Sequence, residues 1–145
     1  MKLLIGSDIH GDLDGAKRLI SAFEEEKCDC IVTWHAAYSP SLESIDALAG
    51  TDLPIVVLDT TETYDFFHST DPDAINLNHG IHGVMDMTNM LLRRGKAYAI
   101  AAGHFPQSDV IEKASRLVKA AAGAMGTIAS VTAFIITKGK YKPKK

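Results

Sequence analysis

Apolar residues along this chain alternate between short continuous runs and longer segments of helical periodicity. The continuous runs lie at residues 2–6, 30–34, 54–58, 97–102 and 128–136. Short runs of this kind, rich in branched side chains, are typical of strands that are buried on both faces. The chain is therefore expected to contain five buried strands.

Between these runs, apolar residues recur every three or four positions, as on one face of a helix. This spacing predicts helices over residues 12–27, 40–50, 84–94 and 106–123. In the second helix, Ser39 and Pro40 are the expected N-cap and first helical residue, and Leu42 is expected to face inward. In the last helix, Ile111 is expected to belong to the inward stripe.

The regular alternation of strands and helices predicts an α/β fold with a parallel sheet. We expect a flavodoxin-like (Rossmann-like) doubly wound domain with five strands over residues 1–137, followed by a basic tail at 138–145. The connection at 59–81 is long and acidic, which is typical of a functional or disordered loop. The tail holds five lysines and is expected to be a solvated end, with a weak contact to polyanions as the alternative.

Composition narrows the possible functions. Of the 145 residues, 46% are hydrophobic and 23% charged, and the net charge is −3. This balance gives no general attraction to nucleic acid or to a membrane surface, and no apolar stretch is long enough to span a bilayer. Cys28 and Cys30 are too closely spaced along one strand to form a good disulfide. We expect reduced thiols in a cytoplasmic protein, with Cys30 as a small core residue.

The histidines are expected to converge on one edge of the sheet. Those that follow strands or lie between a strand and its helix are His10, His35, His79, His82 and His104. In a parallel sheet these positions share the carboxyl edge, where open α/β sheets bind ligands. The acids Asp8, Asp59 and Glu62 and the aromatic residue Trp34 are expected at the same edge.

Residues 78–83, with the sequence NHGIHG, place two histidines and two glycines where a loop becomes a helix. Glycine permits close approach of the backbone to a ligand, and the helix start offers free N–H groups. This segment is the expected centre of the binding site.

Several blocks of the sequence resemble the N-terminal region of the L-fucose and L-arabinose isomerase family. The blocks are IVTWHAAYSPSLE at 31–43, VVLDTTETYDF at 56–66, NHGIHGVMDMTN at 78–89 and AGH at 102–104. They follow the family's order and spacing over residues 29–122, and the resemblance ends near Gly123. The resemblance implies a Rossmann-like domain that covers the sugar site of a neighbouring subunit.

The resemblance also implies an aldose–ketose isomerisation that uses a divalent metal, usually Mn²⁺, whose ligands and catalytic acids lie in later domains. It therefore implies a domain that is not catalytically complete alone, that binds no cofactor by itself, and that works as a homo-oligomer or with a partner domain. By position, His82 matches a histidine that reaches the sugar, and His79 lies near a position that is often glutamine. The expected sugar-binding residues are Trp34, His35, Glu62, His79, His82 and His104. Whether the chain is a free-standing domain or a fragment stays open.

Two other functions stay open. Asp8 and His10 follow the first predicted strand in an Asp-x-His pattern that resembles the first motif of calcineurin-like metallophosphoesterases, where these residues bind one of two metals. That family's second motif is absent, because Thr33, Trp34 and His35 stand in its place. The remaining alternative is a flavodoxin-like binding or scaffold module without chemistry, and no nucleotide-binding glycine motif is present.

Overall fold

The computed structural model describes residues 2–7, 12–123 and 130–136. Its strands are β1 (Lys2–Ser7), β2 (Ile31–His35), β3 (Ile55–Thr61), β4 (Tyr98–His104) and β5 (Ser130–Ile136). Its helices are α1 (Leu13–Glu25), η1 (Ser41–Glu43), α2 (Ile45–Gly50), α3 (Ala74–Leu77), α4 (Gly80–Arg93) and α5 (Val110–Gly123).

The strands form one parallel sheet in the order β1-β5-β2-β3-β4. The predicted α/β fold with a five-stranded parallel sheet is confirmed, and its layers agree with the flavodoxin-like class. The order differs from the 2-1-3-4-5 order of flavodoxin itself. In this chain β5 inserts between β1 and β2, so the connection from β1 to β2 passes over one strand.

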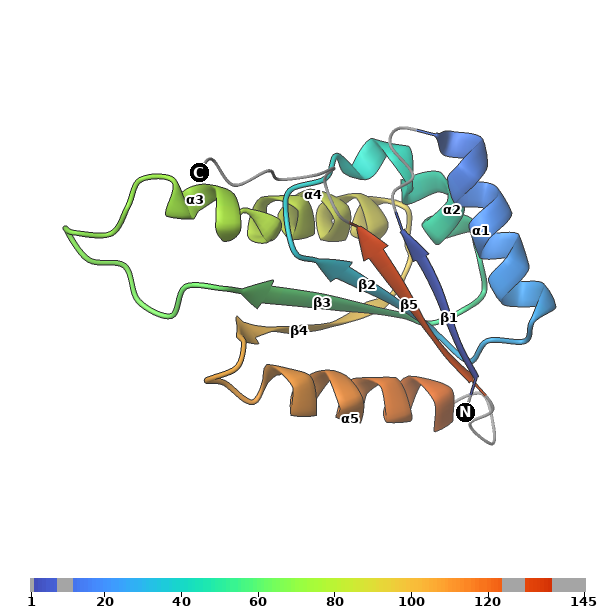
Figure 1. The fold of residues 1–145 in the computed structure, drawn as a ribbon. Coiled ribbons are helices and arrows are strands. Elements are labelled where there is room, and N and C mark those ends of the chain that lie inside the picture. The colour runs from blue at the N-terminus through green and yellow to red at the C-terminus, as the bar shows by residue number, and fades with distance from the viewer. Residues whose placement is uncertain (1, 8–11, 124–129, 137–145) are drawn as a thin grey trace.

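Helices cover both faces of the sheet. Figure 1 shows α1, α2 and α4 on one side and α5 on the other. On the first side, a core cluster joins the sheet to these three helices through Ile20, Phe23, Ile31, Ile45, Leu48, Ile55, Val57, Val84, Met87 and Leu91, among others. On the second side, Cys30, Val32 and Val56 pack against Leu117 and Val118 of α5. Residues of odd and even number in β2 therefore face different helical layers.

Several predicted helix boundaries were wrong. The helix expected over 40–50 is split into η1 and α2 at Ser44, and Pro40 precedes η1 without a side-chain cap. Leu42 consequently faces solvent and is 66% exposed. The last helix begins at Val110 instead of Pro106, and Ile111 is 48% exposed.

Two changes in the middle of the chain matter more for function. β3 continues through Asp59 to Thr61, so this acid lies in the sheet rather than in the loop. α4 begins at Gly80, so the Gly-Ile-His-Gly segment forms the first helical turn. The loop between them also contains the short helix α3, which the sequence did not predict.

The cysteines agree with the sequence analysis. Cys28 and Cys30 are both free and buried, and burial raises the pKa of the Cys30 thiol to about 11. Among the helices that the structure describes, none combines the length and apolar character needed to cross a membrane.

Candidate functional site

The connections that leave β3 and β4 diverge to opposite faces of the sheet. The chain leaving β3 rises to α3 and α4, whereas the chain leaving β4 descends to α5 (Figure 1). Such a divergence between neighbouring parallel strands opens a crevice at their carboxyl ends, which is the usual ligand site of open α/β sheets. The topology therefore places the candidate site between β3 and β4.

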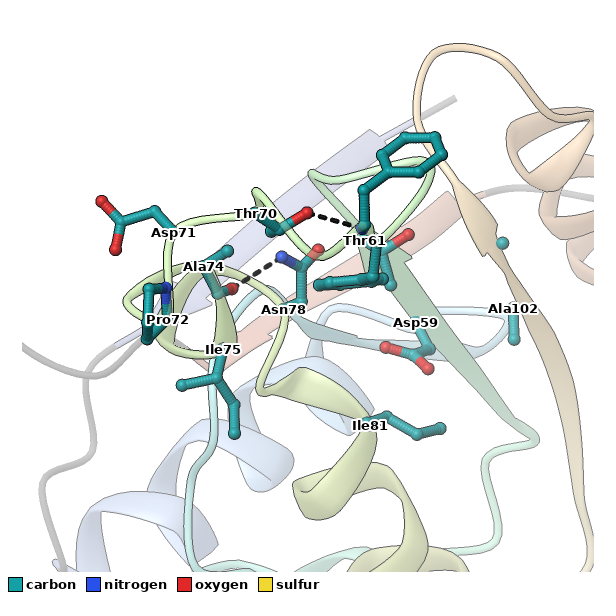
Figure 2. Close-up of a pocket in the computed structure, with 13 residues that line it drawn as sticks. Asp59, Thr61, Thr70, Asp71, Pro72, Ala74, Ile75, Asn78, Ile81 and Ala102 are labelled. Atoms are coloured by element: carbon teal, nitrogen blue, oxygen red, sulfur yellow. Dashed lines mark hydrogen bonds between the residues drawn. The ribbon is translucent and has the colours of Figure 1, made fainter.

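A cavity of about 770 Å³ occupies this position. Figure 2 shows Asp59 and Thr61 of β3 on one side and the loop before α4 on the other. The lining residues are Asp59, Thr61, Phe66, Phe67, Thr70, Asp71, Pro72, Ala74, Ile75, Asn78, Ile81, Ala102 and Gly103. We refer to this cavity as the β3–β4 crevice.

Asn78 holds the loop that forms the outer wall of the crevice. Its Oδ1 accepts hydrogen bonds from the backbone N–H groups of Glu62 (3.0 Å) and Thr63 (2.9 Å). Its Nδ2 donates to Thr63 Oγ1 (2.8 Å) and to the carbonyl of Ala74 (2.7 Å). One side chain thus joins the end of β3 to α3, a role that the sequence analysis missed because these partners are not periodic in the sequence.

Gly80 and Gly83 allow the first turn of α4 to lie directly on the ends of β2 and β3. A Cβ atom at Gly80 would come within 2.2 Å of the carbonyl oxygen of His35 and 3.3 Å of Asp59 Oδ1. A Cβ atom at Gly83 would lie 3.3 Å from His35 Nδ1. Close approach of backbone to backbone, rather than a special backbone angle, requires glycine at these positions.

Beneath this helical turn lies a group of buried polar side chains. Thr33 and His35 are 0% exposed and Asp59 is 3% exposed, and His35 and Asp59 are directly paired across β2 and β3. Within the described residues, Thr33 Oγ1, both ring nitrogens of His35 and Asp59 Oδ1 have no hydrogen-bond partner. Burial lowers the pKa of His35 to about 4 and raises the pKa of Asp59. Both groups are thereby driven toward their neutral forms.

His79 and His82 lie at the start of α4, close to each other. Their ring centroids are 4.4 Å apart, and the Tyr38 ring lies 5.3 Å from that of His79. His82 is exposed and His79 is half-buried. The two histidines thus lie side by side at the start of α4, with Tyr38 as an additional aromatic neighbour.

His104 has both ring nitrogens engaged. Its Nδ1 accepts a hydrogen bond from the backbone N–H of Gln107 (3.2 Å), and its Nε2 lies 3.0 Å from the carbonyl oxygen of Glu62. Because Nδ1 accepts, the neutral ring carries its proton on Nε2 and donates it to Glu62. The Tyr64 ring lies 5.1 Å away, edge-on. His104 therefore ties β4 to the end of β3.

Trp34 lies on the face of the sheet opposite to α4, although it was expected at the same edge as the histidines. Trp34 shares the face of Cys30 and Val32, which packs on α5, and its Nε1 donates to Thr60 Oγ1 (2.8 Å). His35, one residue later, faces α4. Adjacent strand residues point to opposite faces, and this separates Trp34 from the His79–His82 pair.

The structure describes only some of the remaining acids and histidines. Glu62 and His68 are exposed on the loop after β3. Asp8 and His10, the residues of the phosphoesterase alternative, lie outside the described residues. Within the part of the chain that the structure describes, no three His, Cys, Asp or Glu side chains form a group that could hold a metal ion.

Comparison with known proteins finds sequence relatives of this chain. A family profile described as the L-arabinose isomerase N-terminal domain matches residues 8–128. The L-arabinose isomerase of Bifidobacterium animalis subsp. lactis is 28% identical over 112 residues, which cover 76% of this chain and 22% of the relative. That of Acidothermus cellulolyticus is 29% identical over 122 residues, covering 83% of this chain and 24% of the relative. The chain thus spans about a quarter of the length of these curated relatives.

Proposed function

The chain belongs to the family of L-arabinose isomerase N-terminal domains, and we propose that it serves as the sugar-covering part of a ketol isomerase without being a complete catalyst alone. The observation that carries this proposal is the pair of imidazoles, His79 and His82, at the start of α4. They lie at the carboxyl edge of the sheet, and His82 is exposed to solvent.

Imidazoles suit this role chemically. A neutral imidazole donates from one nitrogen and accepts at the other, so it can bind a sugar hydroxyl in either direction. The ring of His79 packs at a tilt against Tyr38 and edge-on against His82, so each imidazole has an aromatic neighbour. Glu62, exposed on the loop after β3, is the acid we assign to the same surface.

The other three residues of the expected site make contacts within the fold. His35 is buried under Gly83, Trp34 is bonded to Thr60, and His104 is bonded to the backbone at both nitrogens. We therefore propose that they position β2, β3 and β4 rather than touch the sugar.

Isomerisation itself requires more than this surface offers. Moving hydrogen between adjacent carbons needs a base at the substrate, or a metal that assists a hydride shift. Mn²⁺, which the resemblance implies, finds no set of ligands among the described residues. We propose that a neighbouring subunit or further domain supplies them, and that the working unit is an assembly in the cytoplasm, where Cys28 and Cys30 stay reduced.

Turnover of L-arabinose by the pure chain with added Mn²⁺ tests the claim of incompleteness. We expect no ketose to form, and clear turnover would refute that claim. L-fucose is the second sugar to assay.

Sugar binding is tested separately by following the imidazole C–H signals by NMR while L-arabinose is added. We expect the signals of His79 and His82 to move, and His82→Ala to abolish the change at His79. His68→Ala is the matched control, because this histidine is exposed on the loop outside the pair. Unchanged His79 and His82 signals at saturating sugar would contradict the proposal.

A further inference from the structure

The β3–β4 crevice combines a buried acid with apolar walls, and we infer that it binds a small organic ammonium ion whose charge pairs with Asp59. This site is distinct from the exposed surface of His79 and His82, and the inference goes beyond the proposed function. It would stand even if that function were wrong.

Asp59 lines the crevice as a buried acid. It is 3% exposed, and its Oδ1 has no hydrogen-bond partner within the described residues. Its neighbours in the sheet are His35, whose ring nitrogens make no hydrogen bond in the described structure, and Ala102. Figure 2 shows the carboxyl group pointing between Asn78 and Ile81, both of which line the crevice. A buried carboxylate without donors gains most from an opposite charge in direct contact.

The walls suit an organic cation. Phe66 and Phe67 line the crevice and are 60% and 69% exposed, and Pro72, Ile75 and Ile81 add aliphatic surface. Aromatic faces attract an ammonium group, and aliphatic surface accommodates the carbon body that carries it. The volume of about 770 Å³ lies within the range of small-molecule sites.

The charge around the crevice selects against anions. Residues 28–92 contain ten Asp and Glu residues and no Lys or Arg. Among the described residues that line the crevice there is no Lys or Arg, and a second acid, Asp71, belongs to its wall. We therefore expect the ligand to supply the positive charge that pairs with Asp59.

A neutral polyol fits this crevice less well. Two of the polar groups in the wall are already used, because Asn78 makes four hydrogen bonds and Thr70 Oγ1 accepts one from the backbone N–H of Phe67 (2.7 Å). A sugar would leave many hydroxyls facing apolar side chains, at a cost in lost hydrogen bonds to water. The chemistry of the crevice thus differs from that of the His79–His82 surface.

Calorimetric titration of the full chain with 2-phenylethylamine at neutral pH tests the inference, with 2-phenylethanol as the neutral analogue of the same shape. We expect the amine to bind at least about tenfold more tightly than the alcohol, as is typical of a charge-assisted hydrogen bond. Asp59→Asn should remove this preference. Asp65→Asn, an exposed acid of the same loop that does not line the crevice, should change the affinity less than about twofold.

Equal binding of amine and alcohol to the wild-type chain, or no binding of either, would overturn the inference. Retention of the preference by a folded Asp59→Asn chain would do the same. If circular dichroism shows that Asp59→Asn does not fold, Phe67→Ala takes its place, since Phe67 is exposed and its loss should weaken amine binding severalfold. An unchanged affinity in Phe67→Ala would then count against the site.

Discussion

Replacement of His35 by leucine should remove a pH-dependent loss of stability from this protein. The side chain is 0% exposed and both of its ring nitrogens lack partners in the described structure. Leucine has a similar size and carries no polar atom, so it leaves no unsatisfied group behind. At neutral pH we expect the variant to be as stable as the wild type, or more stable.

The magnitude follows from the pKa of His35, which burial lowers from 6.5 to about 4. Between these values the unfolded chain binds a proton that the folded chain does not, so the free energy of unfolding falls as the pH falls through this window. At pH 5 the loss amounts to about 2 kcal/mol relative to neutral pH. Burial raises the pKa of Asp59, so the folded chain binds a proton there that the unfolded chain has already released. The contribution of Asp59 to the free energy of unfolding therefore rises as the pH falls, opposite to that of His35.

Urea denaturation at pH 7.5 and pH 5 measures this effect in the wild type and in His35→Leu. The difference between the two proteins isolates the contribution of His35 from that of Asp59. We expect His35→Leu to gain about 2 kcal/mol relative to the wild type between the two pH values. His68→Leu, which removes an exposed histidine, should follow the wild type. Parallel pH profiles for wild type and His35→Leu would refute the reasoning and would indicate that Asp59 stabilises the charged imidazole.

Three further substitutions test the packing around the site by the same denaturation assay and by proteolysis. Gly80→Ala should lower the free energy of unfolding by about 3 kcal/mol, because its Cβ would lie 2.2 Å from a backbone carbonyl oxygen. Gly50→Ala, whose Cβ would have nothing within 4 Å, should be neutral or slightly stabilising, and equal effects of the two substitutions would contradict the close approach of α4. Met87→Ala should lower the free energy of unfolding by about 3 kcal/mol, because Met87 is fully buried and its loss leaves a cavity. Met85 is 56% exposed, so Met85→Ala should lower it by less than about 1 kcal/mol, and a similarly small effect at Met87 would count against the packing of α4. Asn78→Ala should make residues 62–77 the first site of proteolytic cleavage, because the loop loses four hydrogen bonds. An unchanged cleavage pattern would show that Asn78 does not hold the loop.

Much of this fold is determined locally and could be predicted. The apolar runs and helical stripes located every strand and the four main helices, because burial on a sheet or helix face leaves a periodic signal in the sequence. Alternation of strands and helices implies a parallel sheet, and a parallel sheet brings the residues after each strand to one edge. The positions of His79 and His82 at that edge follow from these rules alone.

Other features of the site were decided only by tertiary structure. β2 is apolar on both faces, so it lacks the two-residue alternation that would have separated Trp34 from His35. The insertion of β5 between β1 and β2 depends on contacts between segments far apart in the chain, about which periodicity carries no information.

The same holds for the β3–β4 crevice. Asp59 is buried because Gly80 brings α4 onto the end of β3, and the outer wall exists because Asn78 bonds the loop to the end of that strand. In the sequence, Asp59 is one acid among ten in a segment without lysine or arginine. Only the packing of a helix, a loop and two strands around it buries this acid and leaves its Oδ1 without a hydrogen-bond partner among the described residues.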